Sequence, residues 1–179
     1  MTKQKGFTLI ELVVVIIILG ILAVTALPKF VNLQEEAQAA ALQGLKGALE
    51  GGATLVYSKA AIQAQDSAAC DTVDGSANTA CGAVDINGPT DVVTNYGYPV
   101  AQAAELAKVL EITFASTDNG VTVNGTHDWS TNIPAGSHNT VTPILIYPTA
   151  RTAAGTCHVS YTAATATARP VISVVNSGC

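Results

Sequence analysis

Charged side chains are scarce in this chain. Asp, Glu, Lys and Arg make up 12% of its 179 residues, and hydrophobic residues make up 49%, whereas about 25% of a typical soluble domain is charged. The deficit is greatest in residues 12–27, which contain no charge and Thr25 as their only polar side chain. We expect that segment not to face water. The remaining length suits one ordinary folded domain.

Basic residues are few and scattered. The chain has 8 Lys and Arg against 13 Asp and Glu, a formal net charge of -5, and no basic cluster is interleaved with aromatic residues. An acidic chain without a basic patch has no electrostatic attraction for a phosphate backbone. We therefore expect no nucleic-acid partner.

Motifs for catalysis and metal binding are missing from the sequence. It has no G-x-S-x-G, no H-E-x-x-H, no phosphate-binding loop and no dinucleotide fingerprint. The histidines His127, His138 and His158 are scattered, and the absence of a C-x-x-C pair argues against zinc. The members of a Ser-His-Asp triad need not be neighbours in sequence, but nothing distinguishes one serine from the rest. We predict no enzyme, no catalytic residue, no metal site and no cofactor.

Four cysteines form an even set, namely Cys70, Cys81, Cys157 and Cys179. Together with a start that is typical of an exported protein, they favour disulfides formed in an oxidising compartment. Four cysteines allow three connectivities, among which sequence does not choose. Short loops favour the pairs Cys70 with Cys81 and Cys157 with Cys179.

The N-terminal segment has a short basic start, MTKQKG, followed by about 21 mostly apolar residues. At about 1.5 Å per residue this run spans about 31 Å, close to the thickness of the bilayer core. Lys3 and Lys5 precede the run and Lys29 follows it, so the positive-inside rule places the N-terminus in the cytoplasm. The body that follows is expected to be exported.

Glu11 decides between three interpretations of this segment. A cleaved secretory signal with its cut near residues 24–26, or a plain transmembrane anchor, leaves Glu11 unexplained. A carboxylate in a membrane helix is costly and usually has a partner. Cleavage between Gly6 and Phe7 would create an α-amino group four residues before Glu11, which can pair with it in the same chain or in a neighbouring chain.

Residues 6–11, GFTLIE, resemble the processing site of type IV prepilins. The resemblance implies that a prepilin peptidase and methyltransferase cuts between Gly6 and Phe7 and methylates the Phe7 amine. It further implies that Glu11 docks the subunit onto a growing fibre and that Pro28 is the helix break of the family. The implied partners are other copies of the chain in a helical homopolymer, an assembly ATPase and an inner-membrane platform. The implied location is the inner membrane for the precursor and an extracellular pilus afterwards.

Helical periodicity continues after Pro28 to about residue 64, and Pro28 is expected to kink or weaken the helix. Its predicted core face consists of Phe30, Leu33, Ala37, Ala41, Leu45, Ala48, Gly52, Leu55 and Ile62. A flank formed by Leu42, Leu49 and Val56 is either the edge of that buried face or a contact with neighbouring subunits.

The predicted organisation starts with a leader at 1–6 and a hydrophobic helix for membrane insertion and polymerisation at 7–28. A globular domain follows at 29–179, consisting of an amphipathic helix at 29–64, a loop at 65–99, and a short helix and β-sheet at 100–179. Strands are expected at 121–123, 141–147, 158–163 and 171–175, where β-branched residues alternate with turn signals. An antiparallel sheet packed on the amphipathic helix gives an α+β fold. Type IV pilins have this plan, and many carry a C-terminal disulfide loop that the pair Cys157 and Cys179 resembles.

Residues 42–51, 57–63 and 96–99 resemble the major pilins of the mannose-sensitive haemagglutinin (MSHA) type. This resemblance implies adhesion, biofilm formation and glycans on a host or other surface as partners. The aromatic residues Trp129, Tyr96 and Tyr98 form either a sugar-binding patch or core anchors. The predicted function is a structural pilus subunit. A type II secretion pseudopilin and a membrane-anchored periplasmic binding protein or enzyme are the alternatives.

Overall fold

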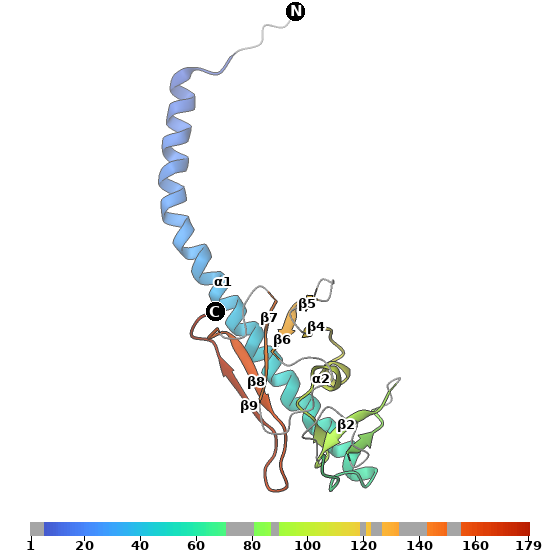
Figure 1. Cartoon of the computed structure of the whole chain (residues 1–179). Helices are drawn as coiled ribbons and strands as arrows, with labels where there is room; N and C mark the ends of the chain where they lie inside the picture. The colour runs from blue at the N-terminus through green and yellow to red at the C-terminus, as the bar shows by residue number, and fades with distance from the viewer. Residues whose placement is uncertain are drawn as a thin grey trace, which may run out of the picture. The chain divides into compact units, whose positions relative to one another are not determined.

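The computed structural model describes residues 6–70, 81–86, 90–118, 121–122, 127–132, 143–149 and 155–179. The chain consists of two units, Met1–Ala37 and Gln38–Cys179. Helix α1, Leu9–Ile62, contributes its first part to one unit and its second part to the other (Figure 1). Each unit is described by itself below.

Helix α1 is 54 residues long and continues through Pro28. This continuity agrees with the predicted long helix, and the kink or weakness expected at Pro28 stays a prediction. Proline removes one backbone hydrogen bond, and the intact turns on both sides keep the segment helical. The helix ends where Ala64 adopts a left-handed φ of 55° and the Gln65 amide donates to the Ala60 carbonyl at 2.8 Å.

The buried face of α1 differs from the predicted one. Its members recur every three or four residues and are Leu42, Leu45, Leu49, Ala53, Val56 and Ala60. The predicted core residues Leu55 and Ile62 are 60% and 85% exposed. The helix carries two apolar stripes about 100° apart, and the stripe rich in Leu and Val packs inward because it offers more apolar area per turn.

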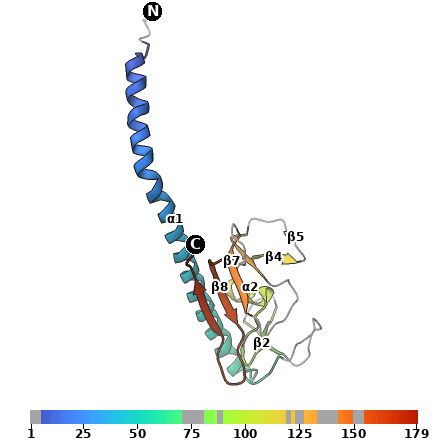
Figure 2. The same ribbon diagram turned by 60° about the vertical axis from the view of Figure 1, so that its left-hand side comes forward.

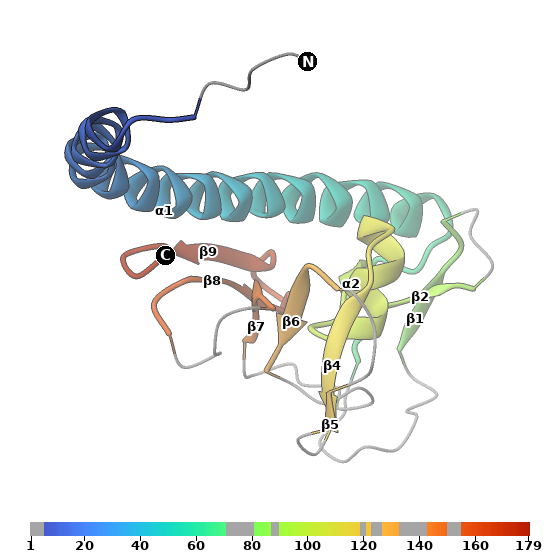
Figure 3. The same ribbon diagram turned by 90° about the horizontal axis from the view of Figure 1, so that it is seen from above.

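The second unit contains a sheet with the order β5-β4-β6-β7-β8-β9. Its strands are β4 Phe114–Asp118, β5 Val121–Thr122, β6 Trp129–Thr131, β7 Ile144–Pro148, β8 His158–Thr162 and β9 Val171–Val175. Figure 2 shows β7 and β8 side by side, and Figure 3 shows β8 and β9 beneath the second part of α1. The α+β prediction is confirmed.

One strand pair departs from the antiparallel prediction. Strands β4 and β6 run parallel, with Phe114 opposite Trp129, while the other pairs of this sheet are antiparallel. Strand β5 turns back along the outer edge of β4, and the chain then joins the other edge of β4 in the same direction as β4. Strands β4 and β6 were not predicted, because both mix polar with apolar residues and β6 has only three residues.

A second, three-stranded sheet lies in the segment that was predicted as a loop. It consists of β1 Gly82–Val84, β2 Val92–Asn95 and β3 Tyr98–Pro99, all antiparallel. The two-residue turn between β2 and β3 has positive φ at Tyr96 (51°) and Gly97 (78°), as a type I′ hairpin requires. The abundant turn residues around these short strands produced the wrong loop prediction.

The main core joins α1, helix α2 (Ala103–Leu110), β7 and β8. Its largest fully buried side chains include Leu42, Leu49, Leu106, Ile144, Ile146 and Tyr161. The Tyr161 hydroxyl donates to the Pro99 carbonyl at 2.7 Å, which links β8 to β3. Burial raises the pKa of Tyr161, so this hydroxyl keeps its proton and remains a donor.

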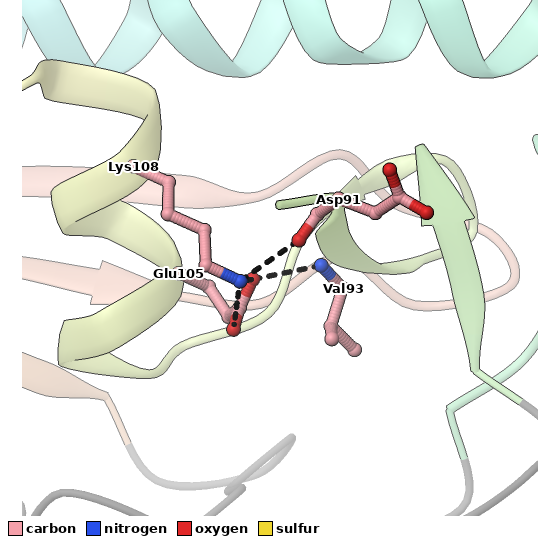
Figure 4. Close-up of polar contacts among 4 residues, drawn as sticks. All are labelled: Asp91, Val93, Glu105 and Lys108. Carbon is pink, nitrogen blue, oxygen red and sulfur yellow. Dashed lines mark hydrogen bonds and ion pairs between the residues drawn. The ribbon is translucent and has the colours of Figure 1, made fainter. Parts of the chain in front are cut away.

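A buried carboxylate fastens α2 to β2 (Figure 4). Glu105 is 6% exposed and accepts hydrogen bonds from Lys108 Nζ at 2.9 Å and from the Val93 amide at 2.8 Å. Lys108 Nζ also donates to the Asp91 carbonyl at 2.8 Å. The pair therefore holds two elements together and satisfies backbone groups of β2 and of the residue directly before it.

Replacing Glu105 with alanine is expected to lower the free energy of unfolding by about 2 to 3 kcal/mol. The change leaves the Val93 amide and the Lys108 ammonium without their carboxylate, and orphaned buried partners are costly. Urea unfolding followed by Trp129 fluorescence measures the loss. Glu50→Ala is the control, because the exposed Lys46–Glu50 pair contributes at most about 1 kcal/mol. Equal losses in the two variants would contradict the anchoring role of Glu105.

Two neighbouring glycines of α1 are expected to respond to alanine with opposite signs. A Cβ at Gly51 meets nothing within 4 Å, whereas a Cβ at Gly52 would lie 2.5 Å from Val109 Cγ1 of α2. Gly51→Ala should raise the free energy of unfolding by up to about 1 kcal/mol through helix propensity. Gly52→Ala should lower it by about 1 kcal/mol, because overpacking outweighs that gain. The same urea unfolding experiment tests both, and stabilisation by Gly52→Ala would show that α2 does not pack closely there.

Candidate functional site

The first turn of α1 is closed by a reciprocal pair of side chains. Thr8 precedes the helix, and both its amide (2.8 Å) and its hydroxyl (2.6 Å) donate to Glu11 Oε2, while the Glu11 amide donates weakly to Thr8 Oγ1 at 3.4 Å. This is a capping box, in which a threonine and a glutamate three residues later satisfy free amides of the first turn. The pattern T-x-x-E was visible in the sequence, but our prediction assigned Glu11 only to a docking role.

Glu11 keeps one oxygen available for a further donor. Within the described residues, the hydrogen bonds to its side chain come from Thr8 and all reach Oε2. Phe7, on the predicted cleavage bond, is 83% exposed. The structure thus places the predicted cleavage residues Gly6 and Phe7 and the predicted docking residue Glu11 together at the accessible start of one helix.

The helix that follows is apolar and fully exposed. Its span Leu9–Ala26 has a mean hydropathy of 3.0, is 0% buried, and is long and apolar enough to cross a membrane. Thr25, the polar exception, donates its hydroxyl to the Leu22 carbonyl at 3.0 Å, so it adds no unsatisfied group. Such a surface requires a bilayer or the apolar faces of other helices around it.

The structure pairs Cys70 with Cys81 and Cys157 with Cys179, the pairing favoured by short loops. Cys157 and Cys179 belong to the main core and join the start of β8 to the C-terminus. Cys70 lies in the segment after α1, where its amide donates to Asn95 Oδ1 at 2.7 Å. Both bonds therefore brace the folded unit.

The other candidate residues from the sequence are the three histidines and the aromatic residues. His127 Nδ1 lies 2.9 Å from Thr113 Oγ1, and His158 Nδ1 lies 3.0 Å from the Gly155 carbonyl. His138 lies outside the described residues. Trp129 packs against the main core, and Tyr98 stacks on Tyr57 with ring centroids 4.6 Å apart. Within the described ranges, no group of three or more His, Cys, Asp or Glu side chains is arranged to hold a metal ion.

The chain combines a helix that is long and apolar enough to cross a membrane, a capped acidic first turn and an α+β body. Residues 1–27 match the prokaryotic N-terminal methylation motif. The chain is 41% identical over 71 residues to the type IV narrow pilus major component PilA5 of Thermus thermophilus. It is also 42% identical over 66 residues to fimbrial protein EcpC of Eikenella corrodens and 38% identical over 87 residues to fimbrial protein Q of Moraxella bovis. Over part of its length the chain is thus similar to a type IV pilus component and to two fimbrial proteins.

The similarity is limited to part of each protein. The three alignments cover 40%, 37% and 44% of this chain and 58%, 43% and 55% of the relatives, so the chain spans about half the length of the curated proteins it matches. No solved structure matches. The family motif itself matches residues 1–27.

Proposed function

We propose that this chain is the structural subunit of a type IV pilus, cut between Gly6 and Phe7, methylated at Phe7 and polymerised through its retained apolar helix. The observation that carries the proposal is the helix Leu9–Ala26, which is entirely exposed and carries an acidic residue in its first turn. A helix with that surface is stable in a bilayer before assembly, and it is stable in a bundle of identical helices afterwards.

In this proposal, Glu11 sets the register between neighbouring subunits of the fibre. A carboxylate at the edge of an apolar bundle needs a cationic donor, and the methylated Phe7 amine of a neighbouring copy provides one. The capping box leaves Oε1 for that amine while Oε2 remains bonded to Thr8. The peptidase, an assembly ATPase and a membrane platform are the partners that such a route requires.

For the assembled fibre we propose surface attachment and biofilm formation, as in the mannose-sensitive haemagglutinin pilins that residues 42–51, 57–63 and 96–99 resemble. The main alternative is a type II secretion pseudopilin, which has the same N-terminal chemistry. The Cys157–Cys179 bond supports the pilin, because pseudopilins commonly have a calcium site where pilins have that disulfide.

N-terminal sequencing and intact mass of material sheared from cells test the proposal. The expected result is a chain that begins with N-methylated Phe7 and two disulfides, recovered from fibres seen by electron microscopy. A chain that begins at Met1 or Leu27 would overturn the pilin proposal. Processed Phe7 without sheared fibres would favour the pseudopilin instead.

A further inference from the structure

The larger sheet of the second unit ends in a long edge strand that lacks the usual protection. Strand β9 pairs with β8 alone among the described residues (Figure 1), and its five pairs run without a bulge from Val171 to Val175. The opposite edge strand, β5, has only two residues, and the outer strands of the smaller sheet, β1 and β3, have three and two. Native proteins protect sheet edges with very short strands, bulges or charged side chains. Residues 170–179 contain no Asp, Glu, Lys or Arg, so β9 has none of these features.

Strand β9 also leaves apolar surface uncovered on both of its faces. On the face that meets the core, Val159 and Tyr161 of β8 are 0% exposed. Ile172 and Val174 lie opposite them on β9 and pack against the same core, but they are only half-buried. On the outer face, Val171 is 61% exposed. A further strand beside β9 would therefore bury apolar side chains on both faces of the sheet.

The sequence of β9, VISVV, is nearly symmetrical about Ser173 and so matches a second copy of itself. In an antiparallel pair of two copies centred on Ser173, Ile172 lies opposite Val174 of the other copy on the core face. Val171 lies opposite Val175 of the other copy on the outer face. Opposed β-branched residues stabilise a sheet. A shift of one residue would bring core-face side chains of one copy onto the outer face of the other, so the symmetrical register pairs all of β9 and keeps both faces.

We propose that β9 binds β9 of a second copy of this chain as an antiparallel pair, which joins the two sheets edge to edge. The contact is isologous, because the same strand serves in both copies, and main-chain hydrogen bonds hold it as in other strand additions. Two chains joined in this way run in opposite directions, whereas the subunits of one fibre all run in the same direction. The contact therefore joins separate fibres that lie side by side in opposite directions. This use of the contact rests on the proposed pilus function, but the pairing itself does not.

Cysteine cross-linking of the full-length chain in detergent micelles tests the pairing and its register. Ser173→Cys is expected to give a covalent dimer under mild oxidation. Directly opposed Cα atoms in an antiparallel pair lie about 4.5 or 5.5 Å apart, and a disulfide can span either distance. The change removes an exposed hydrogen bond to Ser160 Oγ and should leave the fold intact. Mass spectrometry of the dimer checks that the two native disulfides remain.

Val171→Cys is the matched control on the same strand. Residue 171 is exposed, but in the proposed register its two copies lie about 13 Å apart along the paired strands. We expect at least about tenfold less dimer from Val171→Cys than from Ser173→Cys, because that separation is beyond the reach of a disulfide. Mixing Val171→Cys with Val175→Cys should restore the dimer, since these two positions lie opposite each other.

A lysine on the edge provides an independent test. Adding Val171→Lys to Ser173→Cys should reduce the dimer by about tenfold, because the symmetry places two lysines in each pair and each replaces an opposed β-branched contact. Adding Ser58→Lys to Ser173→Cys is the control, because Ser58 is exposed on α1 and lies outside the edge.

The outcomes separate this inference from the proposed function. Absence of a dimer from Ser173→Cys, as much dimer from Val171→Cys, or equal effects of Val171→Lys and Ser58→Lys would overturn the strand pairing. Fibre yield from cells that express Val171→Lys is expected to equal that of the unaltered chain. Because cross-linking is measured on unassembled protein, a failure to form fibres would overturn the pilus proposal and leave the pairing result unaffected.

Discussion

Cells that express Glu11→Ala are expected to hold a folded, membrane-bound subunit and to yield at least tenfold fewer fibres, roughly the effect of losing one charge-assisted hydrogen bond per subunit. The folded unit Gln38–Cys179 does not include Glu11, so its stability should not change. The apolar span Leu9–Ala26 also remains, so membrane insertion should persist. What is lost is the group proposed to receive the Phe7 amine of the next copy. Immunoblots of the sheared and membrane fractions measure the ratio of fibre to precursor.

Thr8→Ala separates docking from helix capping. This variant removes the hydroxyl that donates to Glu11 Oε2 and caps the Glu11 amide, but it keeps the carboxylate. If capping alone explained the need for Glu11, Thr8→Ala and Glu11→Ala would reduce fibre yield equally. If docking explains it, Thr8→Ala should give the milder defect. Normal fibre yield from Glu11→Ala would contradict the docking role.

The long helix illustrates how far periodicity predicts this fold. The spacing of apolar residues located the helix and its end near residue 64, because both signals are local. It centred the buried face on the wrong stripe. Leu55 is exposed, whereas Leu49 on the flank, for which burial was one alternative, is buried, and the packed sheet determines which of these equally apolar residues is covered. Strand β6 was missed for a related reason. Its pairing with β4 and β7 depends on distant segments rather than on the residues of Trp129–Thr131.

The candidate functional residues also divide into those that a local motif predicts and those that depend on distant segments. Gly6, Phe7 and Glu11 follow one another along the chain, so a sequence motif captures them. Contacts in the folded unit, by contrast, join residues that are far apart in sequence, such as the stacked rings of Tyr57 and Tyr98. Sequence reasoning grouped Tyr96 and Tyr98 with Trp129 as aromatic candidates, but Trp129 packs against the core. Contacts between separate elements of the fold cannot be read from local spacing in the sequence.

Replacing Cys157 and Cys179 together with alanine is expected to lower the free energy of unfolding by about 3 kcal/mol. The bond closes a separation of 22 residues, and the chain-entropy model gives a stabilisation of that size for such a loop. Both cysteines also belong to the main core, so their loss exposes packing around the start of β8. Urea unfolding followed by Trp129 fluorescence is a suitable measurement, because Trp129 packs against the same core.

The Cys70→Ala and Cys81→Ala pair provides the comparison. Its bond spans a separation of only 11 residues, and halving a loop reduces the entropic contribution by about 0.6 kcal/mol. Neither cysteine belongs to the main core, so the loss should be smaller than for Cys157 and Cys179. This difference in stability matters for the proposed fibre, because the C-terminal bond fixes residue 179 next to the start of β8. Among the described residues, the neighbouring strand β9 pairs with β8 alone. If removing the Cys70–Cys81 bond costs as much or more, the C-terminal bond is not the principal covalent brace of the folded unit.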